Sequence, residues 1–179
     1  DADIFLSDEI WKSSSAIVNT LLRAINEKEY CEDGATIKLP LKLVIGCSNE
    51  YPTGEETSAI YDRFNIKYES KYIQEDSSFK TLIGMPDEKL EPENRLSRKQ
   101  LAEAIEKAKG IDLPDVIKDT IVRIRKELLA EGIICSPRRW KKAVRIVKAY
   151  ALLSNDATKV QEQDLMFLKN VLWNHPEQR

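Results

Sequence analysis

The sequence has few of the residues that metal-binding and disulfide-rich proteins require. Its 179 residues include one histidine, His175, and three widely spaced cysteines, Cys31, Cys47 and Cys135, with no C-x-x-C pair. These are too few ligands for a structural zinc site, and an odd cysteine count is a poor basis for a disulfide framework. We therefore expect buried or half-buried free thiols in a reducing compartment.

Long apolar runs and a strong charge bias are also missing. No stretch is apolar enough over sufficient length to span a bilayer, and no signal peptide is recognisable. The 28 lysines and arginines nearly balance the 30 acidic residues, for a net charge of −2. This balance argues against a general polyanion binder, so nucleic acid is an unfavoured partner. We predict a cytoplasmic protein with no membrane association, long enough for one domain or two small ones.

A phosphate-binding loop of the form G-x-x-x-x-G-K-[ST] is absent, yet the chain opens on a motif that usually follows one. The apolar run Ile4-Phe5-Leu6 leads through Ser7 to Asp8 and Glu9. Such a run is typical of a buried strand that delivers carboxylates to the edge of an α/β sheet. Asp-Glu at that place is interpreted as a Walker B motif, although a plain N-cap of the following helix is the alternative. We interpret the sequence as part of a nucleotide hydrolase whose first half is missing.

The first half of the chain predicts strands interleaved with helices. A helix is expected from the serines at 13–15 to about residue 27, and Asp33-Gly34 predicts a hairpin. A second buried strand over 41–47 ends in Ser48-Asn49, and alternation predicts a third strand over 65–69.

The second half predicts four helices. A charged stretch with two prolines over 85–94 is interpreted as a linker, which places the domains at 1–90 and 91–179. The helices are expected from a capping box at Ser97 to Gly110, from near Pro114 to Gly132, from Ser136-Pro137 onward, and over 161–173.

Five segments in a fixed order carry a family resemblance. They are 5–12 (FLSDEIWK), 19–27 (NTLLRAINE), 48–50 (SNE), 61–64 (YDRF) and 136–142 (SPRRWKK). Together they resemble the MoxR family of AAA+ ATPases, most closely its RavA-type branch. The resemblance covers nearly the whole chain and implies an α/β fold: the C-terminal part of an AAA+ P-loop core with a parallel sheet, followed by an all-α helical lid.

The resemblance also implies roles for three residues of the first half. Asp8 corresponds to the Mg²⁺-coordinating aspartate, acting through water, and Glu9 to the catalytic base that orients the attacking water. Asn49 resembles the sensor 1 residue, whose neutral amide contacts the lytic water and the γ-phosphate of ATP. The alternative for Asn49 is a loop asparagine that stabilises its own turn.

Three arginines complete the implied ATP site. Arg63 resembles the arginine finger that reaches the γ-phosphate bound by a neighbouring subunit; a salt bridge to Asp62 is the alternative. Arg138 resembles sensor 2 at a helix N-terminus, with Arg139 as the nearby second candidate, because the sequence does not show which of the two points inward.

The implied activity is Mg²⁺-dependent ATP hydrolysis in a homo-oligomeric ring, expected to be a hexamer, that remodels a protein client or assists complex maturation or metal insertion. Partners with a von Willebrand factor A domain are implied as well. Without a phosphate-binding loop we expect this chain alone to be inactive. The alternatives are a DNA-stimulated motor of the MCM-like branch and a non-catalytic protein-interaction module.

Two further features leave their roles open. The cations Arg138, Lys141, Lys142, Arg145 and Lys148 are expected to form a basic stripe opposite Trp140 and Val144, more typical of a solvated or subunit-facing surface than of a nucleic-acid site. The hairpin at Asp33-Gly34 fits either a client-contacting insertion or a plain connection. The three tryptophans are expected to be core or interface anchors.

Overall fold

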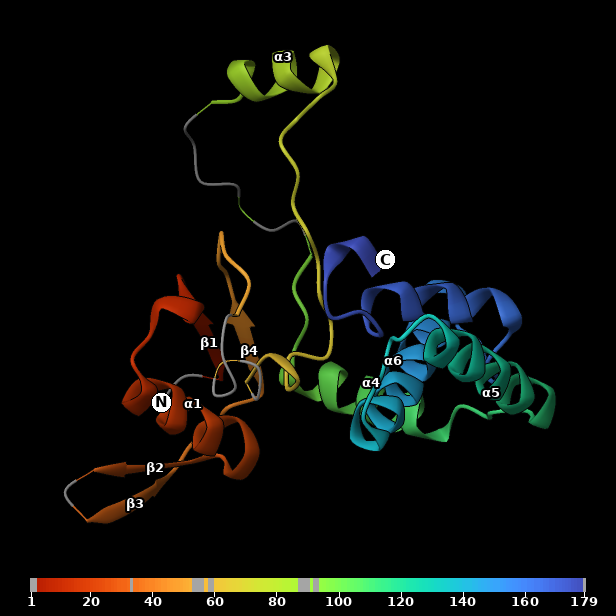
Figure 1. The fold of residues 1–179 in the computed structure, drawn as a ribbon, viewed down its shortest axis with the longest axis horizontal. Coiled ribbons are helices and arrows are strands. Elements are labelled where there is room, and N and C mark those ends of the chain that lie inside the picture. The colour runs from red at the N-terminus through yellow and green to blue at the C-terminus, as the bar shows by residue number, and fades with distance from the viewer. Residues whose placement is uncertain are drawn as a thin grey trace. The chain divides into compact units, whose positions relative to one another are not determined.

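The computed structural model describes residues 3–32, 34–52, 57, 60–86, 91 and 94–178. The chain divides into two compact units, Asp1–Asn65 and Ile66–Arg179, called here the first unit and the helical unit. Figure 1 shows strands in the first unit and the α-helices α3 to α6 in the second. Among the described residues, no helix combines the length and apolarity that a membrane crossing requires.

The first unit is built on two strand pairs and one helix. Strands β1 (Ile4–Ser7) and β4 (Leu43–Gly46) pair in parallel, with Ser7 opposite Gly46. Strands β2 (Glu29–Glu32) and β3 (Ala35–Lys38) form the predicted antiparallel hairpin, although Asp33 of its turn lies outside the described residues. Along the chain, the short 3₁₀ turn η1 (Ile10–Lys12) and helix α1 (Ser15–Glu27) lie between β1 and β2.

The core of the first unit is small. Among the described residues, its contiguous cluster contains Ile10, Leu21 and Ile60, against which Trp11, Leu22 and Phe64 pack. Ala24 and Leu41 are also buried. The apolar side chains of β1 and β4 remain largely exposed among the described residues. A parallel strand pair is normally covered on both faces. Because the described side chains of β1 and β4 are largely exposed, the two strands bury little apolar surface in this unit.

The described part of the helical unit has helical segments at all four expected places, and α3 and η3 in addition. Helix α3 (Asp76–Gly84) precedes α4 (Arg98–Gly110), α5 (Asp115–Ala130) and α6 (Pro137–Asn155), and the 3₁₀ segments η2 (Glu162–Asn170) and η3 (Pro176–Gln178) follow.

The predicted helix starts are present in the helical unit. At the start of α4, Ser97 Oγ accepts from the Gln100 amide at 3.1 Å, and the Gln100 side chain accepts from the Ser97 amide at 2.8 Å. At the start of α6, Ser136 Oγ accepts from the Arg139 amide at 3.1 Å, with Pro137 as the first helical residue. Each cap satisfies amides that a helix leaves without partners in its first turn.

The core of the helical unit is large and contiguous. It joins α5, α6 and η2 through ten buried residues: Ile111, Ile117, Ala143, Val147, Ala151, Val160, Leu165, Leu168, Val171 and Leu172. Leu165, Leu168 and Leu172 point inward as predicted, but their segment is a 3₁₀ helix that ends at Asn170. Trp173 is buried too, in keeping with an anchoring role.

The prediction of a third strand over 65–69 is wrong. Residues 65–69 form no strand, and the Lys67 amide donates to the Asn170 carbonyl at 2.8 Å, outside any strand ladder. The Lys67 ammonium donates to the Trp173 carbonyl at 2.9 Å. These bonds tie Lys67 to the end of the helical unit, so the compact units separate at Asn65/Ile66. The functional domain boundary at residue 90 stays a prediction, and residue 90 itself is not described.

The expected burial of the cysteines holds for only one of them. All three are free thiols, but Cys31 and Cys47 are exposed and only Cys135 is half-buried. Cys31 lies in the two-stranded hairpin and Cys47 directly after β4, where the first unit has few side chains to cover them.

Candidate active site

The ends of β1 and β4 bring two polar segments to the same edge of the first unit. The Cys47 amide donates to the Ser7 carbonyl at 2.8 Å, and the Ile10 amide donates to the Cys47 carbonyl at 3.2 Å. These bonds continue the strand pairing past its last residues. Asp8 and Glu9 therefore leave β1 beside the point where Ser48, Asn49 and Glu50 leave β4, which is where ligands bind in open α/β sheets.

One lysine connects the two segments. The Lys12 ammonium lies 3.0 Å from Glu9 Oε2 and 3.7 Å from Glu50 Oε1. The hydrogen bond from Lys12 to Glu9 and the negative charges of Glu9 and Glu50 raise the pKa of Lys12 above its ordinary value. Lys12 is thus held as a cation between a carboxylate that follows β1 and one that follows β4.

Glu9 has an unusual backbone conformation. Its φ of 51° and ψ of 39° lie in the left-handed region, which a residue with a side chain seldom adopts. The Glu9 amide donates to Asp8 Oδ1 at 3.0 Å, so the turn is stabilised by the neighbouring carboxylate. Strained residues of this kind cost about 1–3 kcal/mol and concentrate at functional sites, which marks Glu9 as a candidate.

Asp8, Glu9, Asn49 and Glu50, called here the acidic edge, offer too few protein ligands to enclose a metal ion by themselves. Asp8 and Asn49 are exposed, and no group of three potential His, Cys, Asp or Glu ligands occurs among the described residues. Mg²⁺ commonly takes one or two carboxylates and fills its other positions with phosphate oxygens and water. An exposed carboxylate oxygen on Asp8 fits that use, with Mg²⁺ arriving together with a nucleotide.

Arg63 contacts the helix of its own unit. The half-buried Arg63 side chain donates through Nε to Asn26 Oδ1 of α1 at 3.1 Å. The backbone around Arg63 is a tight turn, in which the Arg63 amide donates to the Ile60 carbonyl at 2.8 Å. The described structure therefore holds Arg63 against α1.

Aromatic packing fixes the segment that carries Arg63. The Trp11 ring meets the Tyr61 ring edge-on at 5.6 Å and the Phe64 ring edge-on at 6.0 Å between centroids. The Phe64 ring also lies over Gly46 at the end of β4: a Cβ on Gly46 would come within 3.0 Å of it. A glycine at position 46 thus lets the Phe64 ring pack close to the end of β4. Trp11, which follows Asp8 and Glu9, packs the turn of these two acids against the segment that carries Arg63.

The two candidate arginines of α6 differ in environment. Arg139 is buried, with Nη1 donating to Asn174 Oδ1 at 2.5 Å and approaching Cys135 Sγ at 3.8 Å. Arg138, one residue earlier, is exposed. Arg138 and Arg139 lie in the first turn of α6, at the positive end of the helix dipole. No acidic residue occurs in that turn, so a bound anion there would offset the positive charge. Arg139 faces the interior of the helical unit, and Arg138 remains accessible.

The basic stripe of α6 does not lie opposite its aromatic and aliphatic side. Lys141, Arg145 and Lys148 line the same groove as Trp140 and Val144. The prediction that the two stripes lie on opposite sides of the helix is therefore wrong. Consecutive residues of an α-helix are rotated by only about 100° around its axis, so the stripe at 141, 145 and 148 lies next to the one at 140 and 144. The cations form the edge of an apolar surface.

Sequence reasoning assigned no role to Lys12, Glu50, Asn26 or Asn174. Lys12 stands three residues after Glu9, a spacing that permits an ion pair in a helical turn, and this signal was available in the sequence. Asn26 and Asn174 bind arginines that are 37 and 35 residues away, and no local pattern predicts such pairs.

Two family models match the chain. Residues 1–109 match the MoxR domain of MoxR–vWA–β-propeller ternary systems, and residues 116–179 match an AAA lid domain. The chain is therefore the end of an AAA+ α/β core followed by a helical lid, and the fold-class prediction is confirmed. Within that class, the chain belongs to the MoxR family.

Two uncharacterized proteins are similar to nearly the whole chain. The chain is 35% identical to the uncharacterized protein MJ0812 of Methanocaldococcus jannaschii over 99% of its own length and 47% of that protein. It is also 35% identical to MJ0079 of the same organism, over 97% of the chain and 45% of that protein. The chain thus spans about half the length of these relatives.

Among solved structures, a Cytophaga hutchinsonii protein described as a "putative ATPase" shares the fold. The TM-score is 0.76 at 21% identity, and the match covers 97% of this chain and 58% of that one. At this identity the likeness concerns the fold alone.

Proposed function

We propose that this chain is the Walker B-to-lid part of a Mg²⁺-dependent ATPase that works as a hexameric ring to remodel a protein client. The observation that carries the proposal is the edge after β1 and β4, where two carboxylates share Lys12 and Asn49 stands exposed beside them. Family membership supports ATPase chemistry in general. Hydrolysis by this site, assembly into a ring and action on a protein client are proposed here.

In the proposed reaction, Glu9 accepts a proton from the attacking water while Asn49 holds that water and the γ-phosphate in position. Bound Mg²⁺, held through water by Asp8, would neutralise charge on the phosphates. Lys12 occupies Glu9 Oε2, so Glu9 acts through its other oxygen or after Lys12 moves toward Glu50. Lys12 is thus proposed as a positioning residue for the base.

The three arginines take the remaining roles. Arg63, released from Asn26, would stabilise charge on the γ-phosphate held by a neighbouring subunit. The exposed Arg138 would contact phosphate at the N-terminus of α6, while Arg139 holds that turn through Asn174. Arg138 is therefore favoured over Arg139 as the sensor 2 residue. A partner with a von Willebrand factor A domain is proposed because the matched family model is described from systems that contain one.

The test is steady-state ATP turnover by the whole protein, including a phosphate-binding segment, beside two carboxylate variants. Glu9→Gln is expected to lower turnover at least ~100-fold with nucleotide binding retained, because it removes the base. Glu50→Gln is the matched control: it removes the other carboxylate bound to Lys12 and is expected to change turnover less than ~10-fold. Equal losses in both variants, or none in Glu9→Gln, would refute the assignment of the base.

A further inference from the structure

The helical unit carries an apolar groove among α4, α5 and α6, with a volume of about 850 Å³. All three helices contribute to its floor, which includes Ile105, Ile121, Val122, Trp140 and Val144. Ile105 is 48% exposed and Val122 49%, although the same unit has a large buried core. Exposed apolar side chains gathered in one hollow are typical of a surface that binds another molecule.

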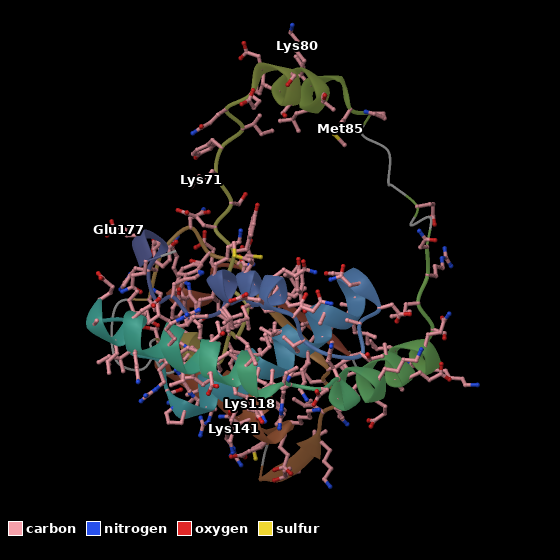
Figure 2. The ribbon with its side chains drawn as sticks, turned by 90° about the vertical axis from the view of Figure 1, so that its right-hand side faces the viewer. Lys71, Lys80, Met85, Lys118, Lys141 and Glu177 are labelled. Atoms are coloured by element: carbon pink, nitrogen blue, oxygen red, sulfur yellow. The ribbon has the colours of Figure 1, made fainter. Side chains whose placement is uncertain are left out.

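The rim of this groove is positively charged. Five cations and no acidic residue belong to its lining: Lys109, Arg125, Lys141, Arg145 and Lys148. Lys109 pairs with Glu106 at 2.6 Å. The other four take part in no ion pair within the part of the chain that the structure describes. Figure 2 shows Lys141 on the outer side of the helical unit, where it is exposed. We call this surface the cationic groove.

Three of the rim cations form a row along α6. Lys141, Arg145 and Lys148 are spaced i, i+4, i+7, so they lie on one side of the helix over two turns, about 10 Å. Carboxylates at the same spacing on a second helix would stand at matching distances. An extended segment places the side chains of one face evenly, about 7 Å apart, and matches the row less well. A ligand with a single carboxylate would leave most of the row without a counter-charge.

The combination of floor and rim selects among classes of ligand. A nucleic-acid backbone offers phosphates to the rim but no apolar face to the floor. A purely apolar ligand offers nothing to the cations. An amphipathic helix whose apolar stripe is bordered by acidic residues offers both an apolar face and carboxylates.

The helices of this chain do not have that character. Within the part of the chain that the structure describes, α1 and α3 each contain one acid and one cation, α4 two acids and four cations, α5 three acids and four cations, and α6 six cations and no acid. The 3₁₀ segments η2 and η3 contain more acids than cations, but Asp164, Leu165 and Leu168 of η2 are buried and η3 has three residues. Charge complementarity therefore favours a helix of a different protein over a helix of the same chain or of a second copy.

We propose that the cationic groove docks an acidic amphipathic helix of a partner protein. The apolar stripe of that helix packs on the floor of the groove, and its carboxylates pair with Lys141, Arg145 and Lys148. None of the residues assigned above to ATP lines the groove, so docking requires no nucleotide and its test is separate from that of ATP turnover.

Selection from a displayed library of helices, with the whole protein as bait, tests the chemistry of the partner. Every library member has the same apolar stripe at i, i+3, i+4 and i+7 over about four turns. Its flanking positions are occupied at random by Glu, Gln or Lys. Enrichment of members with Glu at the flanks is expected. Enrichment of Gln or Lys members, or of none, would contradict the proposal.

A selected Glu-flanked peptide with a fluorescent label then locates the site by anisotropy. Lys141→Glu with Arg145→Glu reverses two exposed rim charges and is expected to weaken binding at least ~10-fold. Lys118→Glu with Lys126→Glu is the matched control, because it changes the net charge equally at exposed positions of α5 that do not line the groove. Its effect is expected to stay below ~2-fold. Equal losses in the two variants would show that the peptide responds to overall charge and not to the groove.

The floor is tested with a second pair of variants. Val122→Ser is expected to weaken peptide binding ~5-fold, because it removes apolar surface from the floor. Val116→Ser is the control: Val116 lies on the same helix, is 74% exposed and does not line the groove, so binding should not change. Unchanged binding in Val122→Ser would overturn the docking of an apolar stripe.

Two rival occupants have outcomes of their own, and either outcome overturns the proposal. If no helix is enriched and Lys141→Glu with Arg145→Glu dissociates an assembly of the whole protein, as measured by sedimentation, the groove belongs to a second copy. If no helix is enriched and the same variant loses binding to a DNA duplex, the groove belongs to nucleic acid.

Discussion

The two units differ in how far they are stabilised by their own burial. In the helical unit, Ala143, Val147, Ala151 and Val171 are all 0% exposed and belong to one core of ten buried residues. The core cluster of the first unit has three buried residues. The strands that carry the acidic edge leave their apolar side chains exposed: 58% for Ile4, 62% for Leu6 and 48% for Leu43.

Most of the proposed catalytic residues, Asp8, Glu9, Asn49 and Arg63, belong to the less buried unit. Helices form their backbone hydrogen bonds internally and need only one covered face, whereas a parallel strand pair needs cover on both faces. The acidic edge is held instead by backbone bonds at the strand ends and by Trp11, Tyr61 and Phe64. The proposed function thus depends on a few specific contacts in the first unit, whereas the broad core lies in the helical unit.

The largest expected effect compares one buried and one exposed position. Val147→Asp places a charge in the helical core and is expected to destabilise the chain by at least ~3 kcal/mol. Ile45→Asp, at a position 42% exposed on β4, is expected to cost less than ~1 kcal/mol. Urea unfolding of the 179-residue chain, followed by circular dichroism, measures both. Similar losses would contradict the contrast between the units.

The next effect concerns close packing at the acidic edge. Gly46→Ala is expected to cost about 1–3 kcal/mol, because its Cβ would lie 3.0 Å from the Phe64 ring and 3.2 Å from Ile10 Cδ1. Gly84→Ala is the control: no atom lies within 4 Å of its added Cβ, and the change should stay within ~0.5 kcal/mol. Thermal unfolding compares the two variants. A neutral Gly46→Ala would show that the edge is loosely packed.

The adjacent arginines of α6 should separate stability from activity. Arg139→Ala is expected to cost about 2 kcal/mol, because it removes a buried hydrogen bond to Asn174. Arg138→Ala is expected to stay within ~0.5 kcal/mol while lowering ATP turnover of the whole protein. Unfolding and turnover are measured on the same samples. The reverse pattern would assign the phosphate contact to Arg139.

The smallest effect is a shift in titration. The hydrogen bond and charge of Lys118 lower the pKa of Asp115 below its ordinary value of 3.8. Stabilisation by this pair is therefore present above the unfolded-state pKa of Asp115 and is lost as the pH falls through the lowered folded-state pKa. Lys118→Met should raise the Asp115 titration midpoint measured by NMR. An unmoved midpoint would show that this exposed pair does not form in solution.

Local patterns predicted much of the fold and less of the site. The capping residues Ser97 and Ser136 and the hairpin act through neighbours in sequence, and these predictions are confirmed. The strands β1 and β4 are present as predicted, but their predicted burial is wrong for the described residues, because their apolar side chains are largely exposed. The contacts of Lys67, Arg63 and Arg139 depend on distant partners, which no periodicity encodes. The same reason accounts for the wrong third strand, since the Lys67 amide bonds to Asn170, far along the chain, which the alternation around it does not encode.

The central claim is that Glu9 and Arg63 serve one ATP site from two neighbouring subunits. Its most direct test is ATP turnover by rings formed from equal amounts of Glu9→Gln and Arg63→Ala whole protein, each nearly inactive by itself. Mixing should restore a substantial part of the wild-type rate, because some interfaces then combine an intact Glu9 with an intact Arg63. Mixed rings that form but stay as inactive as the separate variants would contradict the claim.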